Sequence, residues 1–387
     1  MKLENGKRIR VMRIIARMNV GGPAIQISGL MRGLNVLEFE HRLFTGYCEL
    51  NELDYLDTVA RDVDVTRIDG FGKSISLWSD LNVFFTLVRQ IREFKPQIIH
   101  THTAKAGFLG RLASILSLQP SIRIHTFHGH LLSGYFGKYK RGLVIVAEKT
   151  LAIFTQRLLA VGDRVRTDLL DAGVGKEDKF SVMPPGLEID MLPSKLESQN
   201  YLELNSDRLQ CAFIGRVTQI KRPDRFLDVV AEINARGLEI DFFIAGSGEL
   251  LESCRERILK ECLPVRILGW QVNIERVLSA ADIVVLTSDN EGTPLSLIQA
   301  GMASLPVVAT NVGSVSEVVL DGVTGILTIQ DVGKIADGIQ RLASDQELRG
   351  QLGANGFRYT WAHFGVQRLV HDHEVLYKQL LSSQAKF

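Results

Sequence analysis

The chain has 387 residues, of which 45% are hydrophobic and 23% charged, and its net charge is +1. This composition is typical of a soluble globular protein with two or three domains, and it excludes low-complexity and repeat proteins. The four cysteines are scattered without a CxxC pair, which predicts reduced thiols in a cytosolic protein. No signal peptide is expected, because Arg13 and Arg17 interrupt the first apolar run. No membrane span is expected either, because charges interrupt the most apolar later segment, residues 143–162.

The charge is distributed unevenly along the chain. Residues 1–190 contain 26 Lys and Arg against 20 Asp and Glu, whereas the remainder contains 19 against 24. Residues 123–166 contain eight basic residues and only two acidic ones. We therefore expect the first half to meet an anionic partner, such as a lipid surface or a phosphorylated acceptor, although a solvated basic face would explain the same residues. Nothing in the sequence indicates nucleic acid as a partner.

Short apolar runs alternate with helix-period segments along the whole chain. We expect strands at about 10–18, 42–47, 63–68, 97–102, 122–127, 157–162 and 179–183, and then at about 209–215, 240–245, 265–268, 282–287 and 306–309. This alternation predicts an α/β protein in which a Rossmann-like domain with a parallel sheet occurs twice.

The expected domains follow from this pattern. The first is 1–190, a proline-containing linker is 191–207, the second domain is 208–365, and an amphipathic helix, 366–387, is expected to cross back to the first domain. Parallel sheets bind ligands at the carboxyl ends of their strands. The candidate motifs all follow predicted strands.

Gly21 and Gly22 follow the first strand and precede Pro23, which suits the first turn of a helix. Such a turn can cradle a ligand at the helix N-terminus, although an ordinary strand-to-helix turn also uses glycine. The segment is not GxGxxG, so a dinucleotide cofactor is not expected.

Five histidines gather at two neighbouring strand ends: His100, His102, His125, His128 and His130. A metal site is one interpretation, but no Asp, Glu or Cys accompanies them at ligand spacing. A histidine that hydrogen-bonds a sugar hydroxyl or a reacting group fits the position better.

Arg216 and Lys221 lie in a loop that opens a helix in the second half. Two cations at this spacing, together with helix amides, can converge on a diphosphate. Two solvated surface charges are the alternative.

Two further strand ends carry candidate ligand contacts. Gly246 and Gly248 would let a ligand touch the backbone, and Trp270 with Gln271 could flank a flat base. A core position for the tryptophan is equally compatible with the sequence.

Glu291 and Gly292 stand at a strand-to-helix junction, and Thr293, Pro294 and Leu295 begin the helix, where the free backbone N–H groups of the first turn point toward the crevice. Gln299 lies eight residues after Glu291, about two helical turns. Both side chains could therefore face one ligand.

Two other motifs are set aside. Asp62-Val63-Asp64 resembles a metal-binding D-x-D motif but enters an early strand, so we expect it at the surface. His371-Asp372-His373 lies on a predicted helix, where neighbours at i and i+2 point apart, and is expected to face solvent.

Taken together, the segments MNVGGPAIQISGL, HTHTAKAGFLGR, TFHG, FIGRVTQIKRPD, FIAGSGEL and EGTPLSLIQAG resemble the family 4 retaining glycosyltransferases over essentially the whole chain. The resemblance implies the GT-B architecture, two Rossmann-like domains whose parallel sheets face a central cleft, with the first domain binding the acceptor. It implies that Arg216 and Lys221 hold the donor diphosphate, that Gly22 and His128 lie beside the transferred sugar, and that Glu291 contacts its hydroxyls. The backbone near Leu295 and Ser296 would meet the phosphates.

The sequence departs from the family at Gln299, which occupies the second glutamate of the E-x7-E motif, the ribose-binding position. An amide can still bond a ribose hydroxyl, but without the charge each bond loses roughly half its strength. We therefore expect Gln299 to alter donor affinity more than chemistry.

The resemblance implies a retaining hexosyltransferase, independent of metal and of any cofactor, that uses a nucleoside diphosphate sugar, with UDP as the expected nucleotide. The basic first half favours a lipid-linked saccharide acceptor and a role in surface polysaccharide assembly, at the cytoplasmic face of a membrane. A GT-B sugar-nucleotide epimerase and a non-catalytic sugar-nucleotide-binding subunit are the competing hypotheses.

Overall fold

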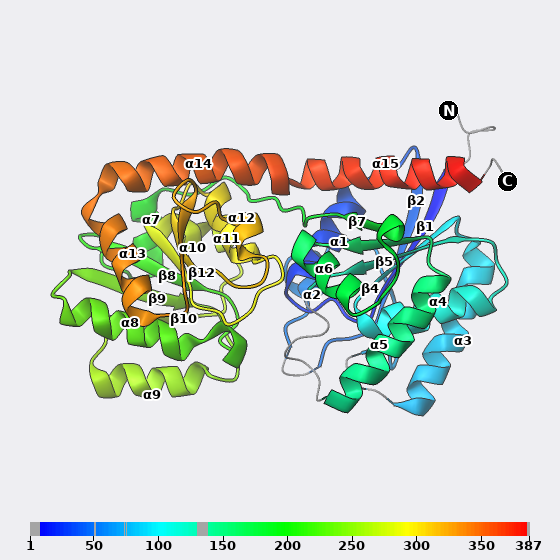
Figure 1. The fold of residues 1–387 in the computed structure, drawn as a ribbon, viewed down its shortest axis with the longest axis horizontal. Coiled ribbons are helices and arrows are strands. Elements are labelled where there is room, and N and C mark those ends of the chain that lie inside the picture. Colours follow the sequence, from blue (N-terminus) through cyan, green and yellow to red (C-terminus); the bar gives the residue numbers. More distant parts are fainter. Residues whose placement is uncertain (1–7, 50–51, 73, 75, 130–137, 385–387) are drawn as a thin grey trace. The chain divides into compact units, whose positions relative to one another are not determined.

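The computed structural model describes residues 8–49, 52–72, 74, 76–129 and 138–384. Within these residues the chain forms two compact α/β units. The first unit comprises residues 1–187 together with 366–387, and the second comprises 188–365. Each unit contains one parallel sheet with helices on both faces, as the alternating pattern predicts (Figure 1).

The sheet of the first unit has seven parallel strands in the order β3-β2-β1-β4-β5-β6-β7. Their bounds are β1 (Ile9–Ile15), β2 (Phe39–Thr45), β3 (Thr66–Arg67), β4 (Ile98–His102), β5 (Ile122–Phe127), β6 (Arg157–Ala160) and β7 (Phe180–Val182). The central strands are buried on both faces, which explains their continuous apolar runs. Strand order reverses between β1 and β4, so the segments that follow these strands meet at the switch point of the sheet.

The helices of the first unit are α1 (Gly22–Gly33), α2 (Tyr55–Thr58), α3 (Leu77–Phe94), α4 (Ala104–Leu116), α5 (Lys138–Ile153), α6 (Asp163–Asp171) and α15 (Val366–Gln384). Helix α15 packs on α1 because Gly29 and Gly33 let the two helices approach closely. A Cβ at Gly33 would lie 2.4 Å from a methyl group of Val370. Leu369 and Tyr377 of α15 complete the core on this face of the sheet.

A buried ion pair joins helices α4 and α5 on the other side of the sheet. Arg111 donates to Glu148 at 2.6 Å, and both side chains are almost completely buried. This pair explains why a carboxylate interrupts the apolar segment that begins at residue 143. Buried charges are retained when they are paired and hydrogen-bonded.

The sheet of the second unit repeats the same plan with six parallel strands in the order β10-β9-β8-β11-β12-β13. Their bounds are β8 (Leu209–Ile214), β9 (Ile240–Ala245), β10 (Val265–Gly269), β11 (Ile283–Leu286), β12 (Val307–Thr310) and β13 (Gly325–Thr328). The helices are α7 (Lys195–Tyr201), α8 (Pro223–Ala235), α9 (Leu251–Glu261), α10 (Ile274–Ala280), α11 (Leu295–Met302), α12 (Val315–Val318), α13 (Val332–Ser344) and α14 (Gln346–Phe364).

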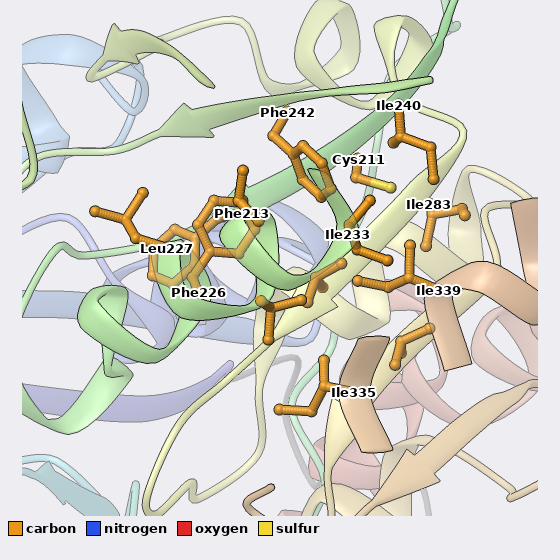
Figure 2. Packing of buried hydrophobic residues seen from close by; sticks show 14 of the residues in the cluster. Cys211, Phe213, Phe226, Leu227, Ile233, Ile240, Phe242, Ile283, Ile335 and Ile339 are labelled. Atoms are coloured by element: carbon orange, nitrogen blue, oxygen red, sulfur yellow. The ribbon is translucent and has the colours of Figure 1, made fainter. Parts of the chain in front are cut away.

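The core of the second unit lies between its sheet and helices α8 and α13. Figure 2 shows Phe213 of β8 beside Phe226 of α8, with ring centroids 5.3 Å apart. Phe242 of β9 meets Phe226 edge to face at 5.9 Å, and Ile335 and Ile339 of α13 close the cluster. Aromatic pairs in these geometries add about 0.5–1.5 kcal/mol beyond their buried area. The core therefore fixes the strand ends that carry the second set of motifs.

Three expectations from the sequence are wrong in detail. The predicted linker 191–207 contains helix α7, which packs against α10, and its Ser198, Leu202 and Leu204 are buried; the chain passes between the units near Leu187 instead. Strand β1 ends at Ile15 rather than 18, because the segment from Ala16 onward leaves the sheet. The last strand, β13, was not predicted because it is only four residues long and follows a glycine turn.

Candidate functional site

In the first unit, the segment after β1 reaches α1 through the predicted glycine turn. Gly21 is the N-cap residue of α1, with φ 158° and ψ 179°, a conformation essentially confined to glycine. Gly22 begins the helix and Pro23 occupies its first turn. No side chain caps α1, so its first amides face outward from a turn that only glycine can form.

The histidines lie at the ends of β4 and β5. His102 ends β4, and its Nδ1 shares a hydrogen bond of 3.0 Å with Nε2 of His128, the residue after β5. His100 bonds Tyr377 through Nδ1 and Thr126 through Nε2, each at 2.7 Å. These nitrogens bond protein groups rather than converging on one point.

His125 lies on the opposite face of the sheet, where Thr101 bonds its Nδ1 at 2.9 Å. His130 lies outside the described residues. Among the described residues, no group of three His, Cys, Asp or Glu side chains is placed to hold a metal ion.

The described histidines at these strand ends, His100, His102, His125 and His128, are neutral near pH 7 because burial lowers their pKa values. Burial lowers the pKa of His128 from 6.5 to about 3. It also lowers the pKa of His100 and of His102 well below 6.5, with the neighbouring rings and Arg13 adding to the shift. Desolvation disfavours the charged form of an imidazole in this way. A histidine held neutral can donate from one ring nitrogen and accept at the other.

The expectation for His371-Asp372-His373 is half wrong. His371 is exposed, but His373 is completely buried and donates from Nδ1 to the carbonyl of Leu369 at 2.8 Å. Burial, together with the charge of Arg13, lowers the pKa of His373 to about 3. The i and i+2 side chains do point apart, and because α15 packs on the first unit, one of them points into the core. The Asp62-Val63-Asp64 motif lies as expected, with both carboxylates exposed and Asp62 paired with Arg32.

In the second unit, Lys221 and Glu291 form an ion pair. The ammonium nitrogen of Lys221 lies 2.5 Å from Oε1 of Glu291, and Ser288 donates its hydroxyl to the same oxygen at 2.5 Å. Only 17% of the Lys221 side chain and 9% of the Glu291 side chain are exposed. The pair joins the segments after β8 and β11, the two strands at the switch point of this sheet.

Backbone and side-chain contacts hold these two segments together. Thr287 donates its hydroxyl to the carbonyls of Lys221 and Arg222, at 3.1 and 3.0 Å. The amide of Asp289 donates to Ile220, and its carboxylate pairs with Arg225 at 2.7 Å. Lys221 is therefore fixed at its backbone as well as at its ammonium group.

Arg216 differs from Lys221. Its side chain is exposed and makes no hydrogen bond or ion pair with any of the described residues. Lys221 ends a short 3₁₀ turn, Gln219–Lys221, and both cations stand between β8 and α8. An exposed arginine beside a fixed lysine is a suitable arrangement for an anionic group with several oxygens.

Gly246 and Gly248 follow β9, and their lack of side chains serves the packing of the neighbouring segment. A Cβ at Gly246 would lie 1.8 Å from the carbonyl oxygen of Gly215, and one at Gly248 would lie 2.3 Å from that of Val217. What approaches these glycines is therefore the backbone around Arg216. They fix the course of the chain that carries the cation.

Trp270 follows β10 with 36% of its surface exposed, so the core interpretation of this residue is wrong. Gln271 donates its side-chain amide to the carbonyl of Leu268 at 2.8 Å, which closes the turn beneath the tryptophan. The indole thus remains available at the same edge of the sheet as the cations.

Helix α11 follows the Glu291 segment. Pro294 is its N-cap residue and Leu295 its first helical residue; no side chain caps the helix. Gly292, Thr293 and Ser296 are half-buried around this N-terminus. Gln299 is also half-buried, and its side-chain amide makes no hydrogen bond to the described part of the chain. The helix N-terminus lies next in the chain to Glu291, where its dipole favours a negative ligand.

Two family models match the chain, one to each unit. Residues 21–186 match a glycosyl transferase 4-like domain, and residues 194–359 match the glycosyl transferases of group 1. The chain belongs to the GT-B glycosyltransferases of family 4 type. The two expected Rossmann-like domains with parallel sheets are confirmed, and so is glycosyltransferase activity as the class of reaction.

Named relatives agree with this family. An Escherichia coli UDP-Gal:alpha-D-GlcNAc-diphosphoundecaprenol alpha-1,3-galactosyltransferase is 28% identical, over 76% of this chain and 78% of its own. The Staphylococcus aureus capsular polysaccharide biosynthesis glycosyltransferase CapM is 24% identical, over 83% and 86%. Among solved structures, Anabaena HepE in complex with UDP superposes with a TM-score of 0.76 at 18% identity, over 98% of this chain and all of that one.

Sequence reasoning missed several residues that shape this candidate site. Ser288 bonds Glu291, and Gly313 lies where a Cβ would be 2.0 Å from the Glu291 carbonyl oxygen. Asp289 and Arg225 join the two segments. The polar run TSDNEG gave a signal for Ser288 and Asp289, whereas Gly313 follows a different strand and could be found only from the fold.

Proposed function

We propose that this glycosyltransferase moves a hexose from a UDP-sugar to a hydroxyl of a lipid-linked saccharide, with retention at the anomeric carbon and without a metal ion. The Lys221–Glu291 pair beside the exposed Arg216 is the observation that carries the proposal. At the carboxyl ends of the strands, Lys221 supplies a fixed cation, Arg216 supplies an exposed cation, and Glu291 supplies a carboxylate for sugar hydroxyls. The galactosyltransferase relative, named for UDP-Gal and a diphosphoundecaprenol acceptor, supports the donor and acceptor classes.

The transfer breaks the bond between the anomeric carbon and the β-phosphate oxygen of the donor, and the electron pair leaves with the diphosphate. The acceptor oxygen bonds to the anomeric carbon on the same face, and its proton passes to the leaving phosphate. Arg216, Lys221 and the first amides of α11 stabilise the charge that develops on the diphosphate. Cations and helix amides take the place of a metal ion in this role.

We assign the remaining contacts as the family resemblance implies. Gly22 and His128 lie beside the transferred sugar, and Glu291 accepts hydrogen bonds from its hydroxyls. Trp270 offers its exposed indole to the flat base, a stacking contact of the kind that aromatic side chains make with nucleobases. Gln299, with its unengaged amide, binds the ribose without the charge that a glutamate would add.

The acceptor side of the proposal rests on an apolar surface of the first unit. Helices α3, α4 and α5 pack side by side (Figure 1). Trp78 and Phe85 of α3 are 81% and 65% exposed, and Leu143 and Ile153 of α5 are 73% and 69% exposed. Lys149 adds an exposed positive charge to α5, whereas Arg89 of α3 is paired with Glu93. Large apolar side chains next to basic ones suit the headgroup region of an anionic membrane.

This surface favours a peripheral protein at the cytoplasmic face of the membrane, where a lipid-linked acceptor is available. Among the described residues, no helix is long and apolar enough to cross a membrane. Part of the basic stretch 123–166, residues 130–137, lies outside the described residues, whereas α3, which the sequence did not single out, carries the exposed Trp78 and Phe85.

The testing experiment begins with thermal unfolding in the presence of UDP-, GDP- and ADP-sugars without added metal. A ligand that binds only the folded protein stabilises it by about 2.7 kcal/mol at a hundredfold excess over its dissociation constant. We expect a UDP-sugar to protect wild type, Arg216→Ala to lose that protection, and Gln299→Glu to bind several-fold more tightly. Protection by no nucleotide sugar, with or without magnesium, would refute the donor assignment.

The second stage separates the competing hypotheses. The bound UDP-sugar is incubated with and without a diphosphate-linked lipid saccharide, and product stereochemistry is read by NMR. A transferase gives an α-linked product from an α-linked donor only with acceptor present. An epimerase converts the sugar nucleotide without acceptor, and a binding subunit gives no product under either condition.

A further inference from the structure

The first unit buries a cation that no carboxylate of the described residues neutralises. Arg13, on β1, is fully buried, and its Nε and Nη2 have no hydrogen-bond partner among the described residues. Its Nη1 donates to the hydroxyl oxygen of Tyr377 at 3.5 Å, and its guanidinium lies 5.8 Å from that ring. Isolated buried charges are costly, so a buried arginine of this kind orients every polar group around it.

Four imidazoles form a column next to this cation. The ring of His373 stacks on His100 with centroids 5.7 Å apart, His100 on His102 at 4.2 Å, and His102 approaches His128 at 5.2 Å. The column runs from α15, across β4, to the residue after β5. It connects the buried arginine to the histidine that the family resemblance places beside the sugar.

The hydrogen bonds of the column have a direction. Tyr377 accepts from Arg13, so its O–H is free to donate to Nδ1 of His100, and Nε2–H of His100 then donates to Thr126. His373 must donate from Nδ1 to the Leu369 carbonyl, which leaves its Nε2 as a bare acceptor. Tyr377 thus offers a lone pair to the guanidinium, and His373 keeps a bare nitrogen, not an N–H, within the field of Arg13.

The same field decides how His102 and His128 share their hydrogen. Both rings are neutral, since burial keeps the pKa of each well below 6.5, so only one hydrogen lies between His102 Nδ1 and His128 Nε2. If it belonged to His128, His102 would carry a buried N–H at Nε2 without an acceptor, within the field of Arg13. If it belongs to His102, that Nε2 is a lone pair, which the cation stabilises. The second arrangement is therefore favoured.

We propose that Arg13 and His102 fix His128 as its Nδ1–H tautomer, so that His128 presents a hydrogen-bond donor, and not a base, to the transferred sugar. His102 is then a positioning residue: it touches no substrate and acts by holding one proton arrangement in His128. This inference depends on the proposed function only for the identity of the ligand that His128 contacts, the transferred sugar. The tautomer itself is a property of the free protein.

The experiment measures the side-chain ¹⁵N shifts of histidine-labelled protein, with His128→Asn to assign the His128 signals among the nine histidines. In wild type, His128 Nδ1 should be protonated and Nε2 bare. In His102→Leu the hydrogen bond from His102 to His128 is lost, and the Nε2–H tautomer of His128 should appear. His102→Asn, whose amide N–H can replace Nδ1–H, should restore the wild-type tautomer. Arg13→Met should also allow the Nε2–H tautomer of His128, and it serves as the second variant if His102→Leu does not fold.

His125 provides a matched control, because it is equally buried at a neighbouring strand end and bonds Thr101 rather than His128. His125→Leu should leave the His128 tautomer unchanged. With donor and acceptor, we expect His102→Leu to lower the rate by about tenfold to a hundredfold, as loss of an outer-shell hydrogen bond does, and His102→Asn to recover most of it.

An Nε2–H His128 in wild type, or an unchanged tautomer in both His102→Leu and Arg13→Met, would overturn the inference. If no transfer is found but the tautomer responds as described, the proposed function fails and the inference stands. If transfer is found with His128 in the other tautomer, the inference alone fails.

Discussion

Replacement of Lys221 by methionine tests whether the ion pair with Glu291 holds together the segments after β8 and β11. The substitution keeps an unbranched side chain that is one atom shorter and removes its charge. It leaves the Glu291 carboxylate, whose side chain is 9% exposed, without its cation. Breaking a buried pair costs about 3–5 kcal/mol, and the 17% exposure of Lys221 lowers this, so we expect a loss of about 2–3 kcal/mol.

The double variant Lys221→Met/Glu291→Gln removes both charges and should lose only about 1 kcal/mol, because no unpaired ion remains buried. The coupling energy is the sum of the two single losses minus the double loss, so it should be at least about 1–2 kcal/mol, plus whatever Glu291→Gln costs alone. Lys334→Met is the matched control: Lys334 pairs with Asp337 in the same unit, but both side chains are more than half exposed, so its loss should cost less than about 0.5 kcal/mol.

The assay is urea unfolding followed by tryptophan fluorescence. Trp78 is the tryptophan of the first unit, so a Trp78→Phe background leaves Trp270 and Trp361 to report on the second unit. For a domain of this size, 2–3 kcal/mol corresponds to a fall in melting temperature of roughly 5–10 °C. If the losses of the two single variants sum to the loss of the double variant within about 0.5 kcal/mol, the reasoning is refuted, since the two side chains then do not interact.

Three further predictions follow from other parts of the structure. Arg216→Ala should lower kcat/KM for donor by about 10²–10³-fold, as loss of one oxyanion donor does, yet leave the melting temperature unchanged because the side chain is exposed; a fall under tenfold would contradict its assigned role. Gly246→Ala should destabilise the second unit in urea unfolding because its Cβ would meet the Gly215 carbonyl at 1.8 Å, whereas Gly350→Ala, in an open helical position of α14, should stabilise it by about 0.5–1 kcal/mol. His373 has its pKa lowered to about 3 in the folded protein, so the unfolded chain binds the extra proton first and stability falls as pH drops from about 6.5 toward 3. Unfolding measured between pH 7 and pH 5 should lose about 2 kcal/mol from this group, and His373→Leu should have a correspondingly smaller pH slope.

The repeated α/β plan could be predicted because parallel strands buried on both faces leave continuous apolar runs, as in β4 and β11. The position of Lys221 and Glu291 at strand ends followed from the same pattern, but their ion pair did not, since 70 residues separate them along the chain. Sequence periodicity shows which face of a strand is apolar, not which neighbouring strand end lies beside it.

The errors have one common cause. The segment 191–207 looked like a linker because of its prolines and polar residues, yet α7 buries Leu202 and Leu204 of the turn that follows it. His373 looked exposed because the motif was judged on its own helix, and the buried position comes from the packing of α15 on the first unit. Both depend on tertiary contacts that a local window does not contain.

The membership of α15 in the first unit has a consequence for how the protein is made. Strand β1 leaves the ribosome early, but His373 and Tyr377, which surround its Arg13, emerge only after the whole second unit has been synthesised. Until then the face of the sheet that Leu369 and Tyr377 cover stays open, with a charged side chain in an unfinished core. The nascent first unit therefore cannot close during translation, and a chain that stops short of α15 presents chaperones and proteases with an exposed apolar sheet. The fold of the first unit can therefore be completed only after α15 has been synthesised.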